Sequence, residues 1–224
     1  MLFRSHPGRA FAREHLGSAH GKTEAWLIVE AEPGAEVRVG WRSDQDRDTI
    51  ADWVRDQDSG AMMDALHAWP VQAGDAVFVP AGTAHAIGAG ILMVELQEPT
   101  DFSILLEHDQ FGVTDEAGAT LGLGWEKAIE ALDRQATDAP EPSPTLPEAA
   151  AAYFRAEHVA APATLDPGFS ILVVLDGSGR VGGLEVARGD TVLVPHAAGA
   201  TQLEGSVEIL RCRPPAPDAP EGAW

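Results

Sequence analysis

Short stretches of alternating or continuous apolar residues recur along the chain and predict β-strands. Residues 24–41 hold two of them around a Pro-Gly turn, and the second alternates valine and tryptophan with glutamate, arginine and glycine. Apolar runs at 76–80 and 91–96 predict two more strands, and further runs separated by glycine turns continue from 169 to 195. Many short strands at close spacing are typical of a sandwich or barrel, so the chain is expected to be mainly β.

Helical periodicity marks two other regions. Residues 44–69 place apolar side chains three or four positions apart in two groups, which predicts a small insert of two short helices. Residues 124–135 place Trp125, Ile129 and Leu132 on one helical face. This second stripe predicts a helix that packs against the sheets and carries no chemistry of its own.

One heptapeptide pattern occurs twice. Gly-Asp-Ala-Val-Phe-Val-Pro at 74–80 returns as Gly-Asp-Thr-Val-Leu-Val-Pro at 189–195, which is 115 positions later (189 − 74). At the same offset His85 becomes Ala200. The repeat predicts two related β-domains, and the second copy keeps the strand without the histidine.

A proline-rich stretch separates the two copies. In residues 137–148 four of twelve positions are proline, which predicts an extended connector. We therefore expect a first domain over 1–136, which includes the helical insert and the closing helix, and a second domain over 149–224.

Charge and cysteine content restrict the partners. The chain has 15 Lys plus Arg against 35 Asp plus Glu, a formal net charge of −20, which argues against nucleic-acid or membrane partners. The single cysteine, Cys212, allows neither an intrachain disulfide nor a thiolate metal cluster. Neither a signal-peptide core nor an apolar run of roughly 18 residues is present, so a cytoplasmic protein is expected. The sequence does not specify an oligomeric state.

A histidine, His85, lies five residues after the end of the first copy of the repeat. The spacing Gly74-x5-Pro80-x-Gly82-x2-His85 places a tight turn before a strand that begins with an imidazole. This spacing resembles the second motif of the cupin superfamily. The resemblance implies small double-stranded β-helix barrels in which inward-facing imidazoles and carboxylates hold a divalent metal.

Two further blocks narrow the resemblance. Lys22-Thr-Glu24 and Pro80-Ala-Gly-Thr-Ala-His85, in this order, resemble the class I mannose-6-phosphate isomerase family over roughly residues 4–135. From 150 onward the likeness is that of a weaker, degenerate cupin domain. The resemblance therefore implies a bicupin arrangement with a small helical insert in the first barrel, and a metal-dependent aldose–ketose isomerase that acts on a sugar or sugar phosphate in carbohydrate metabolism.

The same resemblance implies a ligand set and a metal. Carried onto this chain, the ligands are His6, Glu24 and His85, and the metal is most often zinc. Two imidazoles and one carboxylate with an open position suit a catalytic zinc. His20 is a rival ligand because it lies four residues before Glu24.

Catalytic and substrate-binding candidates come from the same blocks. Lys22 and Glu95 are expected to move the proton between C1 and C2 of the sugar. Arg4 and Arg9 belong to a local excess of cations near the N-terminus, and we expect them to bind the anionic substrate group.

Three departures from the family pattern leave alternatives open. Arg4 stands where the family has a ligating residue, and Leu105 stands where it has an active-site arginine. The chain also begins almost at the ligand pair, so it is either a piece of a longer protein or a minimal form. The alternatives are a non-catalytic sugar-binding or regulatory cupin, and another metal-cupin chemistry such as oxygenation with iron.

Overall fold

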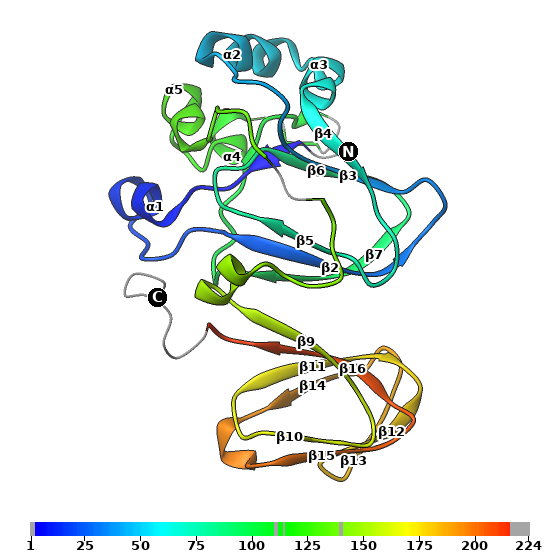
Figure 1. Cartoon of the computed structure of the whole chain (residues 1–224). Coiled ribbons are helices and arrows are strands. Elements are labelled where there is room, and N and C mark those ends of the chain that lie inside the picture. Colours follow the sequence, from blue (N-terminus) through cyan, green and yellow to red (C-terminus); the bar gives the residue numbers. More distant parts are fainter. Residues whose placement is uncertain (1–2, 110–111, 114, 139–140, 216–224) are drawn as a thin grey trace. The chain divides into compact units, whose positions relative to one another are not determined.

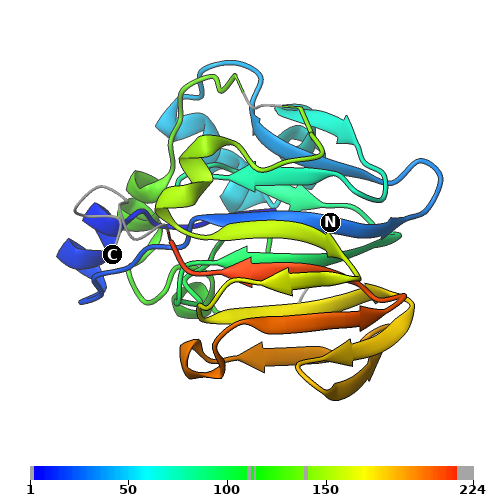
Figure 2. The ribbon, with the colours of Figure 1, turned by 60° about the horizontal axis from the view of Figure 1, so that its bottom comes forward.

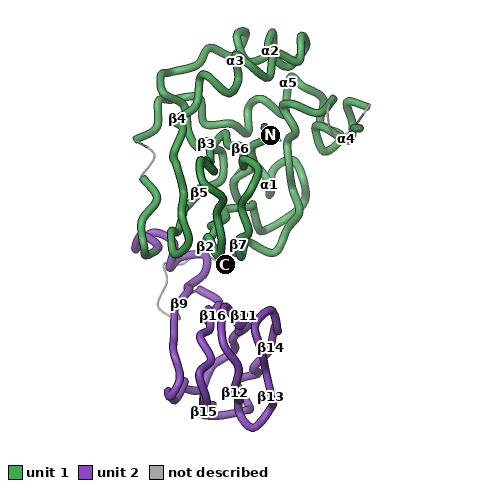
Figure 3. The backbone as a smooth tube through the Cα atoms, turned by 90° about the vertical axis from the view of Figure 1, so that its right-hand side faces the viewer, with its two compact units in different colours: residues 1–145, 224 green, residues 146–223 purple. Residues whose placement is uncertain are grey.

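The computed structural model describes residues 3–109, 112–113, 115–138 and 141–215. The chain divides into two compact units, unit 1 up to Thr145 and unit 2 from Leu146 onward (Figure 3). Within the described residues, no helix combines the length and the apolar character needed to cross a membrane.

Unit 1 is built from two antiparallel sheets (Figure 1). One sheet has the strand order β4-β3-β6-β1-β8 and the other the order β5-β2-β7. Its strands are β1 (Arg4–Ser5), β2 (Glu24–Ala31), β3 (Glu36–Trp41), β4 (Leu66–Pro70), β5 (Ala76–Val79), β6 (His85–Ile87), β7 (Ile91–Gln97) and β8 (Ile104–Leu105). Valines on alternate positions of β3 and β5 pack with Trp26 of β2, so the two sheets enclose a common core.

Helices flank the five-stranded sheet of unit 1. They are α1 (Arg9–His15), α2 (Arg47–Asp56), α3 (Ser59–Asp64), α4 (Glu116–Ala119) and α5 (Trp125–Ala128), followed by a 3-10 turn at Ile129–Ala131. Ile50, Val54 and Met62 are buried in a second core cluster together with Trp41 and Ile129. The apolar stripes of the insert thus supply packing, as their periodicity predicted.

Both predicted helical regions end earlier than expected. Residues 66–69 form β4 rather than helix, because this segment pairs with β3 from Leu66 to Pro70. The helix expected over 124–135 ends by Ala131, and Leu132 is extended. There Asp133 donates its N–H to Gly82 at 2.9 Å and accepts the indole N–H of Trp41 at 2.7 Å. Hydrogen bonds to residues distant in the sequence outweigh helical propensity at both places.

Unit 2 consists of two four-stranded antiparallel sheets (Figure 2). Their strand orders are β10-β15-β12-β13 and β14-β11-β16-β9. The strands are β9 (Arg155–Ala160), β10 (Ala163–Leu165), β11 (Ser170–Asp176), β12 (Ser178–Val181), β13 (Leu184–Ala187), β14 (Thr191–Val194), β15 (Thr201–Gly205) and β16 (Glu208–Arg213). Leu172, Leu203, Val207 and Ile209 are the most deeply buried members of its core. The expected mainly β architecture is confirmed for the described part of the chain.

Candidate metal centre

Three side chains from distant parts of the sequence meet inside unit 1. His6 follows β1, Glu24 begins β2 and His85 begins β6. One ligand atom from each lies within 4.8 Å of the others, and all three residues are buried. Glu24 is central: its Oε2 lies 3.0 Å from His6 Nε2, and its Oε1 lies 3.3 Å from His85 Nε2.

Backbone carbonyls determine which imidazole nitrogen carries the proton. His6 Nδ1 lies 2.7 Å from the Phe102 carbonyl oxygen, and His85 Nδ1 lies 2.9 Å from the carbonyl of Thr83. A carbonyl only accepts, so each Nδ1 is the donor and each Nε2 presents a lone pair toward Glu24.

Lone pairs that face carboxylate oxygens at these distances repel unless a cation lies between them. His6 Nε2 and Glu24 Oε2 are also buried and lack a well-formed hydrogen bond among the described residues. The orphaned His6 nitrogen and Glu24 oxygen, with His85 Nε2 3.3 Å from the same carboxylate, form a donor set that fits a divalent metal.

The protonation states favour ligation. Burial lowers the pKa of His85 to about 3 although the Glu24 charge opposes this, and burial likewise lowers the pKa of His6. Burial acts to raise the pKa of Glu24, but its contacts with His6, His85 and Lys22 outweigh burial and leave that pKa below its ordinary value. Near neutral pH the site therefore holds two neutral imidazoles and one ionised carboxylate, which are the forms that bind metal.

Trp26, which sequence reasoning assigned no role, supports this arrangement. Its indole Nε1–H donates to Glu24 Oε1 at 3.0 Å. Its ring meets the His85 ring edge-on, with 5.4 Å between the ring centroids. Trp26 therefore orients one candidate ligand by a hydrogen bond and another by packing.

Lys22 and Glu95, the expected proton-transfer residues, lie beside the three ligand candidates. Lys22 Nζ is 3.6 Å from Glu24 Oε2 and 3.7 Å from Glu95 Oε1. Burial and the nearby Glu24 charge raise the pKa of Glu95 to about 7, against the opposing effect of Lys22. A carboxyl group that titrates near neutrality can both take up and release a proton.

The two arginines expected at the substrate have different surroundings. Arg4 Nε donates to His85 Nε2 at 3.1 Å, so its guanidinium reaches the centre. Arg4 is also the cross-strand partner of Leu105, the position where the resemblance implies an arginine. Arg9 instead places Nε 2.5 Å from Glu98 Oε1. His20, the rival ligand, is outside the group of three.

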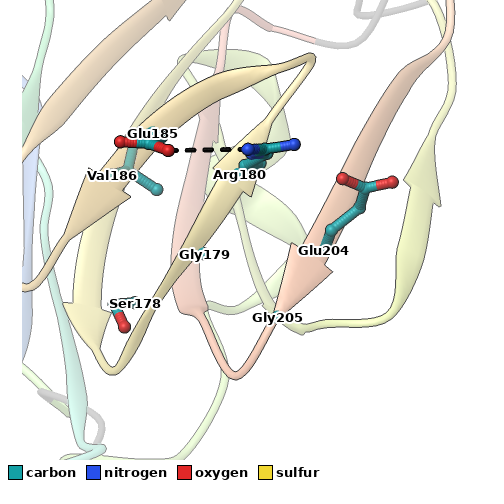
Figure 4. A pocket seen from close by; sticks show the side chains of 7 residues that line it. All are labelled: Ser178, Gly179, Arg180, Glu185, Val186, Glu204 and Gly205. Carbon is teal, nitrogen blue, oxygen red and sulfur yellow. Dashed lines mark hydrogen bonds and ion pairs between the residues drawn. The ribbon is translucent and has the colours of Figure 1, made fainter.

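A separate concave surface lies in unit 2. It has a volume of about 530 Å³ and is lined by Ser178, Gly179, Arg180, Glu185, Val186, Glu204 and Gly205 (Figure 4). Its Arg180 is paired with Glu185 at 3.5 Å, and both side chains are exposed. Because its cation is already paired and its charges face water, this surface offers no chemistry comparable to the buried centre of unit 1.

The fold and the three converging side chains define a mainly β protein of cupin type with a candidate site for one divalent metal. No protein-family model matches the chain. The mannose-6-phosphate isomerase of Streptococcus mutans is 28% identical over 220 residues, which cover 92% of this chain and 67% of that protein. Mannose-6-phosphate isomerase ManA of Bacillus subtilis is 29% identical over 231 residues, with 92% and 68% covered.

Solved structures show the same fold. The mannose 6-phosphate isomerase structure from Bacillus subtilis matches with a TM-score of 0.72 at 22% identity, over 95% of this chain and 71% of that one. A phosphomannose isomerase structure from Salmonella typhimurium, that of an R274A mutant, matches with a TM-score of 0.67 at 11% identity, over 96% and 76%. The chain is therefore similar to class I mannose-6-phosphate isomerases in sequence and fold, as its sequence motifs indicated.

Proposed function

We propose that this chain is a zinc-dependent aldose–ketose isomerase that interconverts mannose 6-phosphate and fructose 6-phosphate. The observation that carries the proposal is the buried group of His6, Glu24 and His85, with both Nε2 lone pairs turned toward the Glu24 carboxylate. The names of the relatives supply the reaction and the substrate class. A cytoplasmic location stays a prediction from the sequence.

His6, Glu24 and His85 would hold the metal. When bound, the metal supplies Lewis-acid polarisation of the substrate oxygens at C1 and C2. The protein supplies the rest: carbonyl groups fix both imidazoles, and Trp26 fixes the carboxylate.

Glu95 is the proton carrier in this proposal. It takes the proton from C2 of the aldose and returns it at C1, while the hydroxyl proton passes from O2 to O1. The enediol intermediate therefore collapses to the ketose with no net proton change. Its pKa of about 7 suits both transfers. Lys22 lies 3.7 Å from Glu95 and is 4% exposed, so its ammonium stabilises the negative charge that develops on the substrate oxygens.

Arg4 provides a second cation at the centre. The position opposite it, Leu105, has no charge, and cross-strand partners have their Cβ atoms about 5 Å apart on one face of the sheet. We therefore assign Arg4 the contact with the anionic substrate that an arginine at 105 would otherwise make.

The alternative of a non-catalytic sugar-binding cupin is not favoured. Binding alone requires neither a carboxyl group that titrates near pH 7 nor a buried lysine beside it. The named relatives are isomerases.

A metal-reconstitution assay tests the proposal. Metal-free protein is loaded with zinc, and conversion of mannose 6-phosphate to fructose 6-phosphate is followed. We expect turnover that is lost on chelation and reduced about 100- to 10,000-fold by Glu95→Gln, because general acid–base groups contribute on that order. Glu204→Gln, which removes an exposed strand carboxylate in unit 2, is the control and should retain full activity.

Zinc binding without turnover of any aldose phosphate would favour the binding protein. Bound iron with consumption of dioxygen would favour oxygenation.

A further inference from the structure

One loop contacts both chain segments that supply the candidate ligands His6, which follows β1, and Glu24, which begins β2. It covers residues 98–103, directly after β7. Thr100 Oγ1 donates to the Gly21 carbonyl at 2.6 Å, and the Phe102 carbonyl accepts from His6 Nδ1 at 2.7 Å. The loop therefore connects the segment around His6 to the segment that precedes Glu24.

Glu98 is the most deeply buried contact of this loop and has no part in the proposed reaction. It is 3% exposed. Its Oε2 accepts the N–H of Thr23 at 2.9 Å, and its own N–H donates to the Thr23 carbonyl at 3.0 Å. Both backbone polar groups of Thr23 are thus held by Glu98, and Thr23 is the residue between Lys22 and Glu24.

The other carboxylate oxygen of Glu98 binds the chain segment that contains His6. Oε1 lies 2.5 Å from Arg9 Nε, and Arg9 begins α1, three residues after His6. The two segments are also in direct backbone contact, since Lys22 N–H donates to the Pro7 carbonyl at 3.1 Å.

Gly21 permits that approach. A Cβ at position 21 would lie 2.5 Å from the carbonyl oxygen of Pro7 and 2.8 Å from the nitrogen of Arg9. Residues 7–9 and 21–23 are therefore packed backbone to backbone, with Glu98 bridging them.

A buried carboxylate is costly unless its oxygens are satisfied by charge and hydrogen bonds, and Glu98 satisfies both of its oxygens with groups adjacent to candidate ligands. We propose that the Glu98–Arg9 ion pair is a positioning device that sets the separation of His6 and Glu24, and through it the affinity of the site for its metal. The inference rests on the proposed metal centre and gives Glu98 and Arg9 a role apart from ligation of the metal.

Glu98→Gln is the test variant, because it keeps the shape and removes the charge. A neutral amide offers one acceptor oxygen where two donors, Thr23 N–H and Arg9 Nε–H, now bind. We expect zinc affinity of the metal-free protein, measured by competition with a chromophoric chelator, to fall about 10- to 100-fold, as is typical when an outer partner of a metal ligand is lost.

Glu36→Gln is the matched control within the same unit. Glu36 accepts from Arg38 Nε at 3.0 Å and from its Nη2 at 2.9 Å, so the variant also breaks an Arg–Glu pair. It should change zinc affinity less than twofold. Arg9→Gln is the second variant, and the double variant Arg9→Gln/Glu98→Gln should lose no more affinity than Glu98→Gln alone, since residues that act as a pair are not additive.

Amide hydrogen exchange over residues 21–24 gives a readout that needs no metal. The Thr23 amide should exchange at least tenfold faster in Glu98→Gln than in the wild type, and Glu36→Gln should leave it unchanged. Wild-type zinc affinity together with unchanged exchange in Glu98→Gln would overturn the inference. If the wild type takes up no zinc, the proposed function fails, and the exchange at Thr23 alone then supports or overturns the positioning role.

Discussion

The two units share a strand-and-turn frame and differ where unit 1 has its candidate ligands. In each, a glycine with positive φ, Gly74 or Gly189, donates to the neighbouring strand at 2.9 Å. In each, the following aspartate accepts a backbone N–H from three residues earlier, at 2.9 Å in one unit and 2.8 Å in the other. The repeated sequence therefore encodes one turn and one strand pairing, used twice.

Strand register makes the two interiors comparable residue by residue. Glu24 pairs with Val79 in unit 1, and Ser170 pairs with Val194 in unit 2. Val194 is the repeat counterpart of Val79, 115 positions later (194 − 79). Ser170 therefore occupies the position in unit 2 that Glu24 occupies in unit 1. In the same way Ala200 stands at the position of His85.

The neighbouring strand differs in charge. Glu95 pairs with Trp26, and its counterpart Arg211 pairs with Leu172. Arg211 is 2% exposed and binds Asp166 through Nη1 at 2.5 Å and through Nη2, which donates to the Asp166 carbonyl, at 2.7 Å. Where unit 1 gathers candidate ligands for a cation, unit 2 buries the Arg211 guanidinium, so the shared strand-and-turn frame does not require a metal site.

The largest expected effect is the loss of metal from unit 1 with its fold retained. His85→Ala removes one of the three candidate ligands and should lower zinc affinity more than 100-fold. Cooperative urea unfolding should persist, because the repeat accommodates alanine at position 200. Metal analysis and urea unfolding measure the two parts. Loss of cooperative unfolding would mean that His85 is required by the frame itself.

The reciprocal change is the control. Ala200→His places an imidazole at the unit 2 position that corresponds to His85, where Ser170 stands at the position of Glu24 and Arg211 at the position of Glu95. It should take up no zinc. Uptake there would show that the two interiors are more alike than their charges indicate.

The next effect concerns stability of unit 2. Asp166→Asn leaves the buried Arg211 with Glu157 at 3.6 Å as its remaining carboxylate partner. We expect a loss of about 2 kcal/mol in the free energy of unfolding, below the usual value for a fully buried pair because Asp166 is 60% exposed. Glu185→Gln breaks the exposed pair with Arg180 in the same unit and should cost under about 0.5 kcal/mol. Equal losses in urea unfolding would mean that the Arg211 pair is no more important than a surface pair.

The smallest expected effect is a pH dependence of stability that arises from His85 in unit 1. Its counterpart in unit 2, Ala200, has no titratable group. Burial lowers the pKa of His85 from 6.5 to about 3. Between these pH values His85 binds a proton in the unfolded chain but not in the native state. Stability from His85 is therefore present above pH 6.5 and is lost as the pH falls toward 3.

Between pH 7.5 and 5.5 the metal-free wild type should lose about 1 kcal/mol more stability than His85→Gln. The comparison needs the variant, because Glu95 acts in the opposite direction. Its pKa is raised to about 7, so its contribution grows as the pH falls. Parallel pH profiles for wild type and His85→Gln would contradict the assignment of a neutral, buried His85.

Local sequence determined much of this protein. The strands at 24–41, 76–80 and 91–96 and the repeated turn were readable, because each depends on residue types within one short segment. The three ligand candidates came from the resemblance to the mannose-6-phosphate isomerase family. Glycine and aspartate determine the turn, and alternating or continuous apolar residues determine the strands. The Lys-Thr-Glu and Pro-Ala-Gly-Thr-x-His blocks identified Glu24 and His85.

Only the tertiary structure determined the contacts between residues that are distant in the sequence. Only the sheet register places Arg4 opposite Leu105 and against His85, and only the loop after β7 brings Glu98 to Thr23 and Arg9. The same cause converts residues 66–69 from helix to strand. The residue type of a side chain is known from its own segment. Its partner, its burial and therefore its charge state depend on how segments pack that are tens of residues apart in the sequence.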